Sequence, residues 1–217
     1  MDKLSKRGIK MKTKALIIRQ NDLFFKEHFY NWLAKERGLY ELYNRLAKEY
    51  KKEKSKGPLL LEDTFKLVAG GLTKKEFEEY CKNFFKKFYI KETEKVLKKI
   101  ENKYEIFIST SFPEKLFEFF KFKKIIVGVR EKLREGKIIG FNNLKIKNKE
   151  KVKRKLEEID LYNTFTLEPN RYGCLIKIID YLINNWPQEV IGIGKSPTAQ
   201  PIKKITTKWI NNLEELV

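Results

Sequence analysis

Three polar segments of this sequence directly follow short apolar runs, and they hold side chains suited to binding a ligand. The runs and the polar residues after them are residues 15–18 with Arg19, Asn21 and Asp22, residues 105–108 with Ser109 and Thr110, and residues 189–194 with Lys195 and Ser196. Guanidinium, ammonium and hydroxyl groups donate hydrogen bonds to anions, and Asp22 supplies the only carboxylate among these residues. The side-chain types therefore favour an anion-binding site, provided that the fold brings the segments together.

Continuous apolar runs of this length are typical of buried parallel strands, which alternate with helices in α/β proteins. Residues 124–127 form another such run, and the turn at 135–137 predicts a hairpin that continues to residue 141. Helical periodicity occupies residues 23–100, 149–159 and 172–185. Because open α/β sheets bind ligands at the carboxyl ends of their strands, we expect the polar segments at one edge of the sheet.

The long helical block falls between the first predicted strand and the second. Its sequence Thr73-Lys-Lys-Glu76 is a capping box, which begins a helix. We predict an α/β fold with a Rossmann-like parallel sheet and an inserted helical cap above the carboxyl end of the first strand. The predicted units are a basic N-terminal arm of residues 1–14, a core of residues 15–22 and 101–217, and a helical cap of residues 23–100.

The composition of the 217-residue chain excludes several classes of protein. No apolar run approaches the roughly 18 residues of a membrane span, and no secretory signal is recognisable before residue 15. Cys81 and Cys174 lie far apart and form no CxxC pair, so neither a disulfide scaffold nor a zinc finger is expected. These features predict a cytoplasmic protein without a membrane partner, and they do not predict its oligomeric state.

The net charge of the chain is strongly positive. Lys and Arg number 48 against 29 Asp and Glu, which gives +19. Such an excess favours a phosphorylated ligand, a nucleic acid or an acidic protein as partner, and a lysine-rich composition without a specific partner is the alternative. Residues 121–155 concentrate the charge, with 14 Lys and Arg against Glu131, Glu135 and Glu150, a net charge of +11. This cluster either follows a phosphate backbone or forms a solvated lysine-rich surface.

Three stretches of the chain together carry a family resemblance. They are residues 71–77 leading into 106–114, residues 126–141, and residues 191–202. In the first, helices lead into a strand that ends in Ser and then a helix; in the second, a hydrophobic strand precedes a Gly-containing hairpin. In the third, Gly-Lys-Ser-Pro-Thr-Ala stands where Gly-Asp-Ser-x-x-Asp is usual. These stretches resemble the haloacid dehalogenase-like superfamily, particularly its phosphoserine-phosphatase-like branch, which carries a helical cap between its first two strands.

The resemblance implies an active-site loop, Asp-x-Asp-x-Thr, directly after the first strand. In that family the first Asp attacks phosphorus and the second is the general acid and base. Here Arg19 occupies the nucleophile position and Asn21 the acid–base position, and neither a protonated guanidinium nor an amide can take these roles. Lys195 and Ala199 replace the two metal-binding acids of the family, so no Mg²⁺ and no other cofactor is expected.

The positions that correspond to the family's phosphate-binding residues resemble the family more closely than the catalytic positions do. Ser109, or Thr110 one residue further on, matches the hydroxyl of the second loop, and the basic residue of the third loop is Lys151 or Arg171. We therefore predict a catalytically degenerate protein with a cationic site for a phosphorylated or other anionic ligand or partner. The predicted anion-binding residues are Arg19, Ser109, Thr110, Lys151, Arg171, Lys195 and Ser196.

Two alternatives to this prediction stay open. One is an active phosphomonoesterase that uses Mg²⁺ and acids at shifted positions, with Asp22 as its nucleophile. The other is a basic subunit that binds a nucleic acid or an acidic protein, for which the net charge and the basic arm are the motivation.

Overall fold

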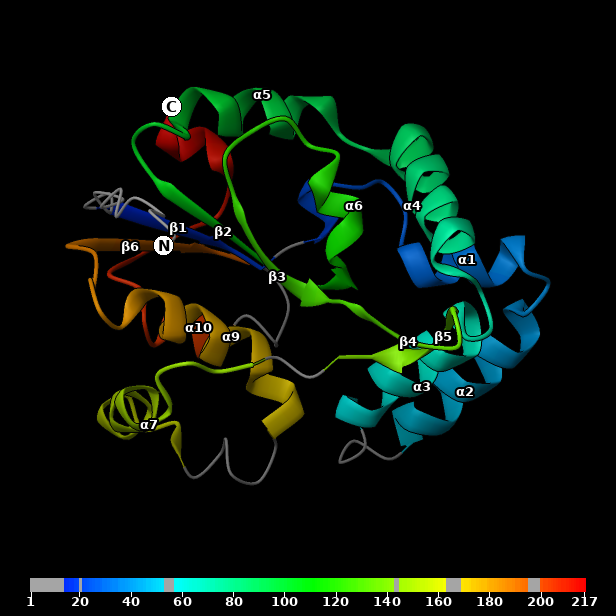
Figure 1. The fold of residues 1–217 in the computed structure, drawn as a ribbon. Coiled ribbons are helices and arrows are strands. Elements are labelled where there is room, and N and C mark those ends of the chain that lie inside the picture. The colour runs from blue at the N-terminus through cyan, green and yellow to red at the C-terminus, as the bar shows by residue number, and fades with distance from the viewer. Residues whose placement is uncertain (1–13, 20, 53–56, 143–144, 163–168, 195–199) are drawn as a thin grey trace, which may run out of the picture.

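A five-stranded parallel sheet forms the centre of the computed structural model, which describes residues 14–19, 21–52, 57–142, 145–162, 169–194 and 200–217 (Figure 1). The side chains of residues 51, 52, 57–59 and 169–172 lie outside this description. The strands are β1 (Lys14–Ile18), β2 (Glu105–Pro113), β3 (Ile125–Val129), β6 (Glu189–Ile193) and β7 (Lys208–Ile210). Their order is β3-β2-β1-β6-β7, and every neighbouring pair is parallel.

The register of the sheet brings the ends of its three central strands together. Ile18 of β1 is aligned with Ile108 of β2 on one side and with Ile193 of β6 on the other. Since the strands are parallel, the residues that follow these three positions emerge at the same edge of the sheet.

Side chains along β1 alternate between two apolar layers, as expected for a strand that is buried on both faces. Leu16 and Ile18 belong to an apolar cluster that they share with the helical segments between β1 and β2 and with η4 (Leu213–Leu216). Ala15 and Ile17 belong to the layer formed with α7 (Lys149–Glu158), α9 (Pro169–Leu182) and α10 (Gln200–Lys203). All four side chains are fully buried, which explains why this run holds no polar residue.

The helices between β1 and β2 form two groups. They are α1 (Phe29–Glu36), α2 (Tyr40–Lys52), α3 (Gly57–Ala69), α4 (Lys74–Phe88) and α5 (Lys91–Ile100). Helices α1–α4 lie together beyond one end of the strands, and their aromatic core includes Phe29 packed edge-on against Phe77 and Phe84 (Figure 1). Helix α5 instead contacts η4, in the layer that covers the sheet.

A hairpin of β4 (Glu131–Arg134) and β5 (Lys137–Phe141) connects the sheet region with the group α1–α4. Its turn residues, Glu135 and Gly136, have φ values of 52° and 76°, as a type I′ turn requires. The main chain of β5 pairs with the start of the α3–α4 connection: Gly71 N donates to Ile138 O at 3.0 Å, and Ile138 N donates to Leu72 O at 2.8 Å. The hairpin is therefore attached to the helical group, although it follows β3 in the chain.

The structure confirms the predicted α/β class, the parallel sheet and the hairpin. The predicted capping box is also present, with Thr73 Oγ1 accepting from Glu76 N and a Glu76 carboxylate oxygen accepting from Thr73 N. Lys14 was assigned to the N-terminal arm, but it is the first residue of β1 and its ammonium contacts Glu189 at 2.6 Å.

Two further elements differ from the sequence-based expectation. The edge strand β7 was not predicted. Helix α5 packs over the sheet, although the predicted cap of residues 23–100 includes it. The division into arm, core and cap otherwise stays a prediction. Within the described ranges, no helix combines the length and the apolar character that crossing a membrane would require.

Candidate functional site

Polar side chains from β1 and β2 meet at the carboxyl edge of the sheet. We call Arg19, Asn21, Ser109, Thr110 and Ser111 the strand-end cluster. Arg19 directly follows β1, and its main-chain N donates to Ile193 O of β6 at 2.8 Å, which continues the pairing of the sheet by one residue. Asn21 begins η1 (Asn21–Leu23), the short 3₁₀ helix that leads away from the sheet. The cluster therefore lies where the sequence predicted a ligand site.

Arg19 contacts a hydroxyl group. Its Nη1 donates to Ser109 Oγ at 3.3 Å, and among the described residues no carboxylate forms an ion pair with it. Ser109 is 1% exposed, and Arg19 is half-buried. Ser109 accepts in this contact, and no described residue takes its proton or the other N–H groups of the guanidinium, so with respect to the described residues these donors are available to a further acceptor.

Asn21 bridges to two other hydroxyl groups of β2. Its Oδ1 accepts from Thr110 Oγ1 at 2.7 Å, and its Nδ2 donates to Ser111 Oγ at 3.4 Å. Thr110 Oγ1 also accepts from Phe112 N at 2.9 Å, so the proton and one of the two lone pairs of the Thr110 hydroxyl are engaged. Of the two hydroxyl candidates in the second loop, Ser109 is thus the one whose proton is not donated to a described residue.

Ser111 and Tyr30 belong to this arrangement and were not predicted. Tyr30 of α1 donates its hydroxyl to Ser111 O at 2.7 Å and is buried, which raises the pKa of its phenol. Ser111 directly follows Ser109 and Thr110 in the same polar run of β2, and this position in the sequence could have identified it. Tyr30 carries no comparable local signal, since its partner is 81 residues away.

The described residues at this edge do not fit Mg²⁺. That ion needs carboxylate oxygens, and Arg19 presents a cation there instead. Asp22 lies in η1 and is exposed. In the part of the chain that the structure describes, no group of three or more His, Cys, Asp and Glu side chains could hold a metal ion.

The two candidates for the third basic residue occupy different places. Lys151 of α7 donates to Asn184 Oδ1 at 2.8 Å. Asn184 lies between the end of α9 and the start of β6, so this contact is at the amino edge of the sheet, away from the strand-end cluster. Arg171 is in the first turn of α9. One turn later in the same helix, Cys174 Sγ lies 3.7 Å from Thr110 O. The amino-terminal end of α9 therefore adjoins the strand-end cluster.

Four positions considered in the sequence analysis lie wholly or partly outside what the structure describes. Lys195 and Ser196, together with Ala199, lie outside the described residues, and so does the side chain of Arg171. The structure thus brings together Arg19, Asn21, Ser109 and Thr110, and it does not bring Lys151 to them.

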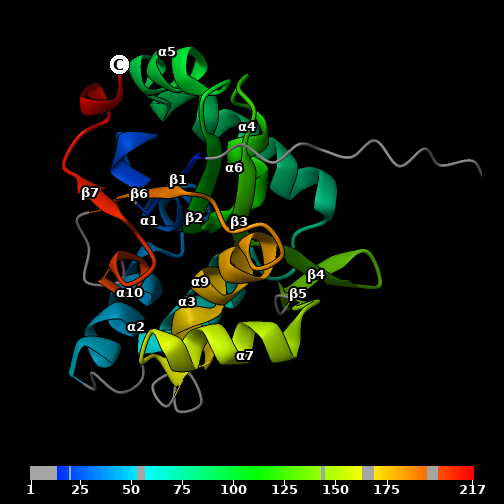
Figure 2. The ribbon, with the colours of Figure 1, turned by 90° about the vertical axis from the view of Figure 1, so that its left-hand side faces the viewer.

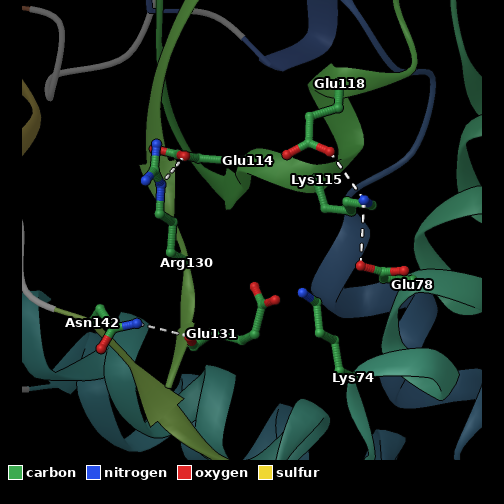
Figure 3. Close-up of a pocket in the computed structure, with 8 residues that line it drawn as sticks. All are labelled: Lys74, Glu78, Glu114, Lys115, Glu118, Arg130, Glu131 and Asn142. Atoms are coloured by element: carbon green, nitrogen blue, oxygen red, sulfur yellow. Dashed lines mark hydrogen bonds and ion pairs between the residues drawn. The ribbon is translucent and has the colours of Figure 1, made fainter. Parts of the chain in front are cut away.

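A second charged region is a cavity of about 360 Å³. It is lined by residues of α4, of α6 (Glu114–Glu118) and of the β3–β4 connection (Figure 3). We call it the charged cavity; its lining residues are Lys74, Glu78, Glu114, Lys115, Glu118, Arg130, Glu131 and Asn142. Its charges are largely paired: Lys115 Nζ lies 3.3 Å from Glu78 and 3.0 Å from Glu118, and Arg130 Nε donates to Glu114. No predicted site residue lines this cavity.

Glu114 is the buried member of the charged cavity. Its side chain is 9% exposed; Oε1 accepts from Gly128 N at 2.9 Å, and Oε2 accepts from Arg130. Burial raises the pKa of Glu114, and the hydrogen bonds from Gly128 and Arg130 only partly oppose this effect.

Comparison with known proteins identifies the fold. No family model matches the sequence, and no curated protein matches it. Among solved structures, a phosphoserine phosphohydrolase-like protein from Francisella tularensis has a TM-score of 0.57 at 13% identity, over 94% of this chain and 97% of that one. A substrate-bound phosphoserine phosphatase has a TM-score of 0.52 at 18% identity, over 95% and 97% of the two chains.

A HAD family hydrolase from Salmonella enterica serovar Typhi is also similar, with a TM-score of 0.56 at 11% identity over 90% of this chain. The chain spans only 61% of the length of that hydrolase, but nearly all of the two phosphoserine phosphatase-type structures. Similarity at these identities is evidence of a shared fold and does not extend to activity. The chain has the haloacid dehalogenase-like fold.

Proposed function

We propose that this protein is a catalytically degenerate member of the phosphatase-like group, and that it binds a phosphate-containing or other anionic ligand at the strand-end cluster without hydrolysing it. The observation that carries the proposal is the contact between Arg19 and Ser109. It puts a guanidinium without a described carboxylate partner at the carboxyl end of the central strand.

The proposed lack of hydrolysis rests on the side chains at the end of β1. The protonated guanidinium of Arg19 has no nucleophilic lone pair with which to attack phosphorus, and the amide of Asn21 neither takes up nor releases a proton near neutral pH. Asn21 is also held by hydrogen bonds at both ends of its amide. Asp22 is exposed in η1 and has no second acid two residues further on, because Phe24 is there.

Anion binding is favoured by the cationic character of the same edge. In an active relative, Mg²⁺ offsets the charge of the phosphate; here the guanidinium of Arg19 would do so directly, together with the Ser109 hydroxyl. We include Lys195 and Ser196 from the last loop and Arg171 from α9 in the proposed site. Lys151 is left out because its contact with Asn184 places it at the other edge.

Hydrolysis assays test the catalytic half of the proposal. p-Nitrophenyl phosphate should not be turned over by the wild-type protein, with or without Mg²⁺. Turnover that disappears in the Asp22→Asn variant would contradict the proposal and would support the active phosphomonoesterase instead.

Thermal denaturation with inorganic phosphate tests the binding half. A ligand that binds only the folded state raises Tm, by about 3 °C at a phosphate concentration about ten times Kd for a chain of this size. The shift should disappear in Arg19→Gln. Arg130→Gln is the matched control, because it removes the same charge from a residue that also directly follows a strand, yet should keep the shift.

A double variant sharpens this measurement. Arg19→Asp combined with Lys195→Asp places acids at two positions where the family has them, so phosphate should no longer raise Tm and Mg²⁺ could do so instead. If this variant keeps the phosphate-dependent shift of the wild type, the bound anion lies elsewhere and the proposed site is wrong.

A further inference from the structure

The basic cluster of residues 121–155 does not form one surface. Part of its charge is neutralised or engaged locally: Arg130 pairs with Glu114, and Lys124 Nζ donates to Phe120 O at 2.6 Å. The densest run of cations without an ion pair to a described residue lies around α7, in residues 145–155. That stretch carries seven cationic residues and a single acidic one, Glu150.

We call the exposed cationic residues of this stretch the α7 surface: Lys145, Lys147, Lys149, Lys151, Lys153 and Arg154. None of them forms an ion pair with a described residue. The neighbouring Lys155 does pair, with Glu158 at 2.8 Å. Val152 and Leu156 are buried and attach the helix to the protein, so its cationic side chains are free to meet a partner.

The α7 surface is built on an anchored segment. Asp180 of α9, whose side chain is 2% exposed, accepts from Lys147 N at 3.0 Å and from Asn148 N at 2.8 Å. Helix α7 packs on α9, which in turn contacts the sheet, so α7 forms an outer layer (Figures 1 and 2). In Figure 1 α7 lies away from the group α1–α4. Lys151 of α7 contacts Asn184 at the amino edge of the sheet, whereas the strand-end cluster lies at the carboxyl edge, so the two regions are separate.

Aromatic rings lie on both flanks of α7. The ammonium of Lys155 is 4.7 Å from the ring centroid of Trp186, and that of Lys153 is 5.2 Å from the ring centroid of Tyr162. Both rings are half-buried. Proteins that bind single-stranded nucleic acids combine two features: cationic side chains that follow the phosphate backbone, and aromatic rings between them on which bases stack. An acidic peptide would use the charges and leave the ring faces without a role.

We propose that the α7 surface binds the phosphodiester backbone of a single-stranded nucleic acid. The backbone contacts Lys147, Lys149, Lys153 and Arg154, and bases stack beside Trp186 or Tyr162. Binding of this type is independent of sequence and is driven by the release of counterions.

Fluorescence anisotropy with a labelled oligothymidylate tests the proposal on the full chain. If four phosphates are neutralised, affinity should fall roughly 50-fold between about 50 and 200 mM NaCl. The variant Lys147→Gln, Lys149→Gln, Lys153→Gln, Arg154→Gln should bind about 10-fold more weakly at low salt and lose most of the salt dependence.

A second variant with the same net charge is the control. Lys75, Lys82, Lys86 and Lys95 are exposed on α4 and α5 and form no ion pair with a described residue, and their replacement by Gln also lowers the net charge by four. This control should lose less than about 3-fold in affinity, and thermal denaturation should show both variants to be folded. Equal losses in the two variants would show that the field of the whole protein attracts the probe, which would overturn the proposal.

Two other outcomes would overturn it as well. One is the absence of oligothymidylate binding by the wild type at low salt. The other is competition by poly-glutamate that is as effective, per charge, as competition by unlabelled oligothymidylate, because the surface would then fit an acidic protein equally well. Weak competition by poly-glutamate supports a nucleic acid as the partner.

Discussion

Arg19 and Arg130 are each the first residue after a strand of the same sheet, yet their surroundings differ. Arg19 directly follows β1 and Arg130 directly follows β3. Arg130 Nε donates to the buried carboxylate of Glu114, whereas Arg19 Nη1 donates to the neutral hydroxyl of Ser109. One cation is therefore paired with a carboxylate, whereas the other has no carboxylate partner among the described residues.

The difference shows how strongly local pairing changes the electrostatic character of the two regions. The charged cavity around Arg130 contains three basic and four acidic residues, and its ion pairs Arg130–Glu114 and Lys115–Glu78 cancel most of the field there (Figure 3). The strand-end cluster contains one arginine, one amide and three hydroxyl groups. Its single charge therefore has more influence on an incoming anion than the larger number of charges in the cavity.

Removing the carboxylate of Glu114 should have the largest effect. Glu114→Ala leaves Gly128 N–H buried without an acceptor and Arg130 without its partner, so the free energy of unfolding should fall by about 2–3 kcal/mol. Urea denaturation at neutral pH measures this loss. Glu114→Gln is the control: it keeps an acceptor for Gly128 and should lose only about 1 kcal/mol. Equal losses in the two variants would show that the Gly128 hydrogen bond contributes nothing.

Giving Arg19 an acidic neighbour should make its surroundings resemble those of Arg130. Asn21→Asp keeps the acceptor for Thr110 and removes the donor to Ser111, at a cost of about 1 kcal/mol. The new carboxylate, two residues from Arg19, should reduce or abolish the phosphate-dependent rise in Tm. A full shift in this variant would mean that Arg19 is not the residue that meets the anion.

The smallest expected effect is a dependence of stability on pH through Glu114. Its pKa in the folded protein is above the usual 4.5, so between that value and the raised pKa the folded state binds more protons than the unfolded state. Stability from this group is therefore largest at acidic pH and declines as pH rises through this window. The wild type should show this decline relative to Glu114→Gln in denaturation curves measured across the window; parallel curves would contradict it.

Local features of this protein could be predicted from its sequence. The apolar run before Arg19, the capping box at Thr73 and the turn at Glu135 and Gly136 each depend on residues close together in the chain, and each is present in the structure. The residue types at the end of β1 are equally local, so the presence of Arg19 and Asn21 there is visible without any structure.

Only the tertiary structure decided which charged side chains are paired and which of the predicted site residues contact one another. Arg19 and Ser109 are 90 residues apart, and Glu114 and Arg130 belong to separate elements, so no periodicity relates them. The positions of Lys151 and α5 likewise depend on how helices pack over the sheet. Strand and helix signals arise from neighbouring residues, whereas these contacts arise from register and from packing between distant segments, which local patterns do not encode.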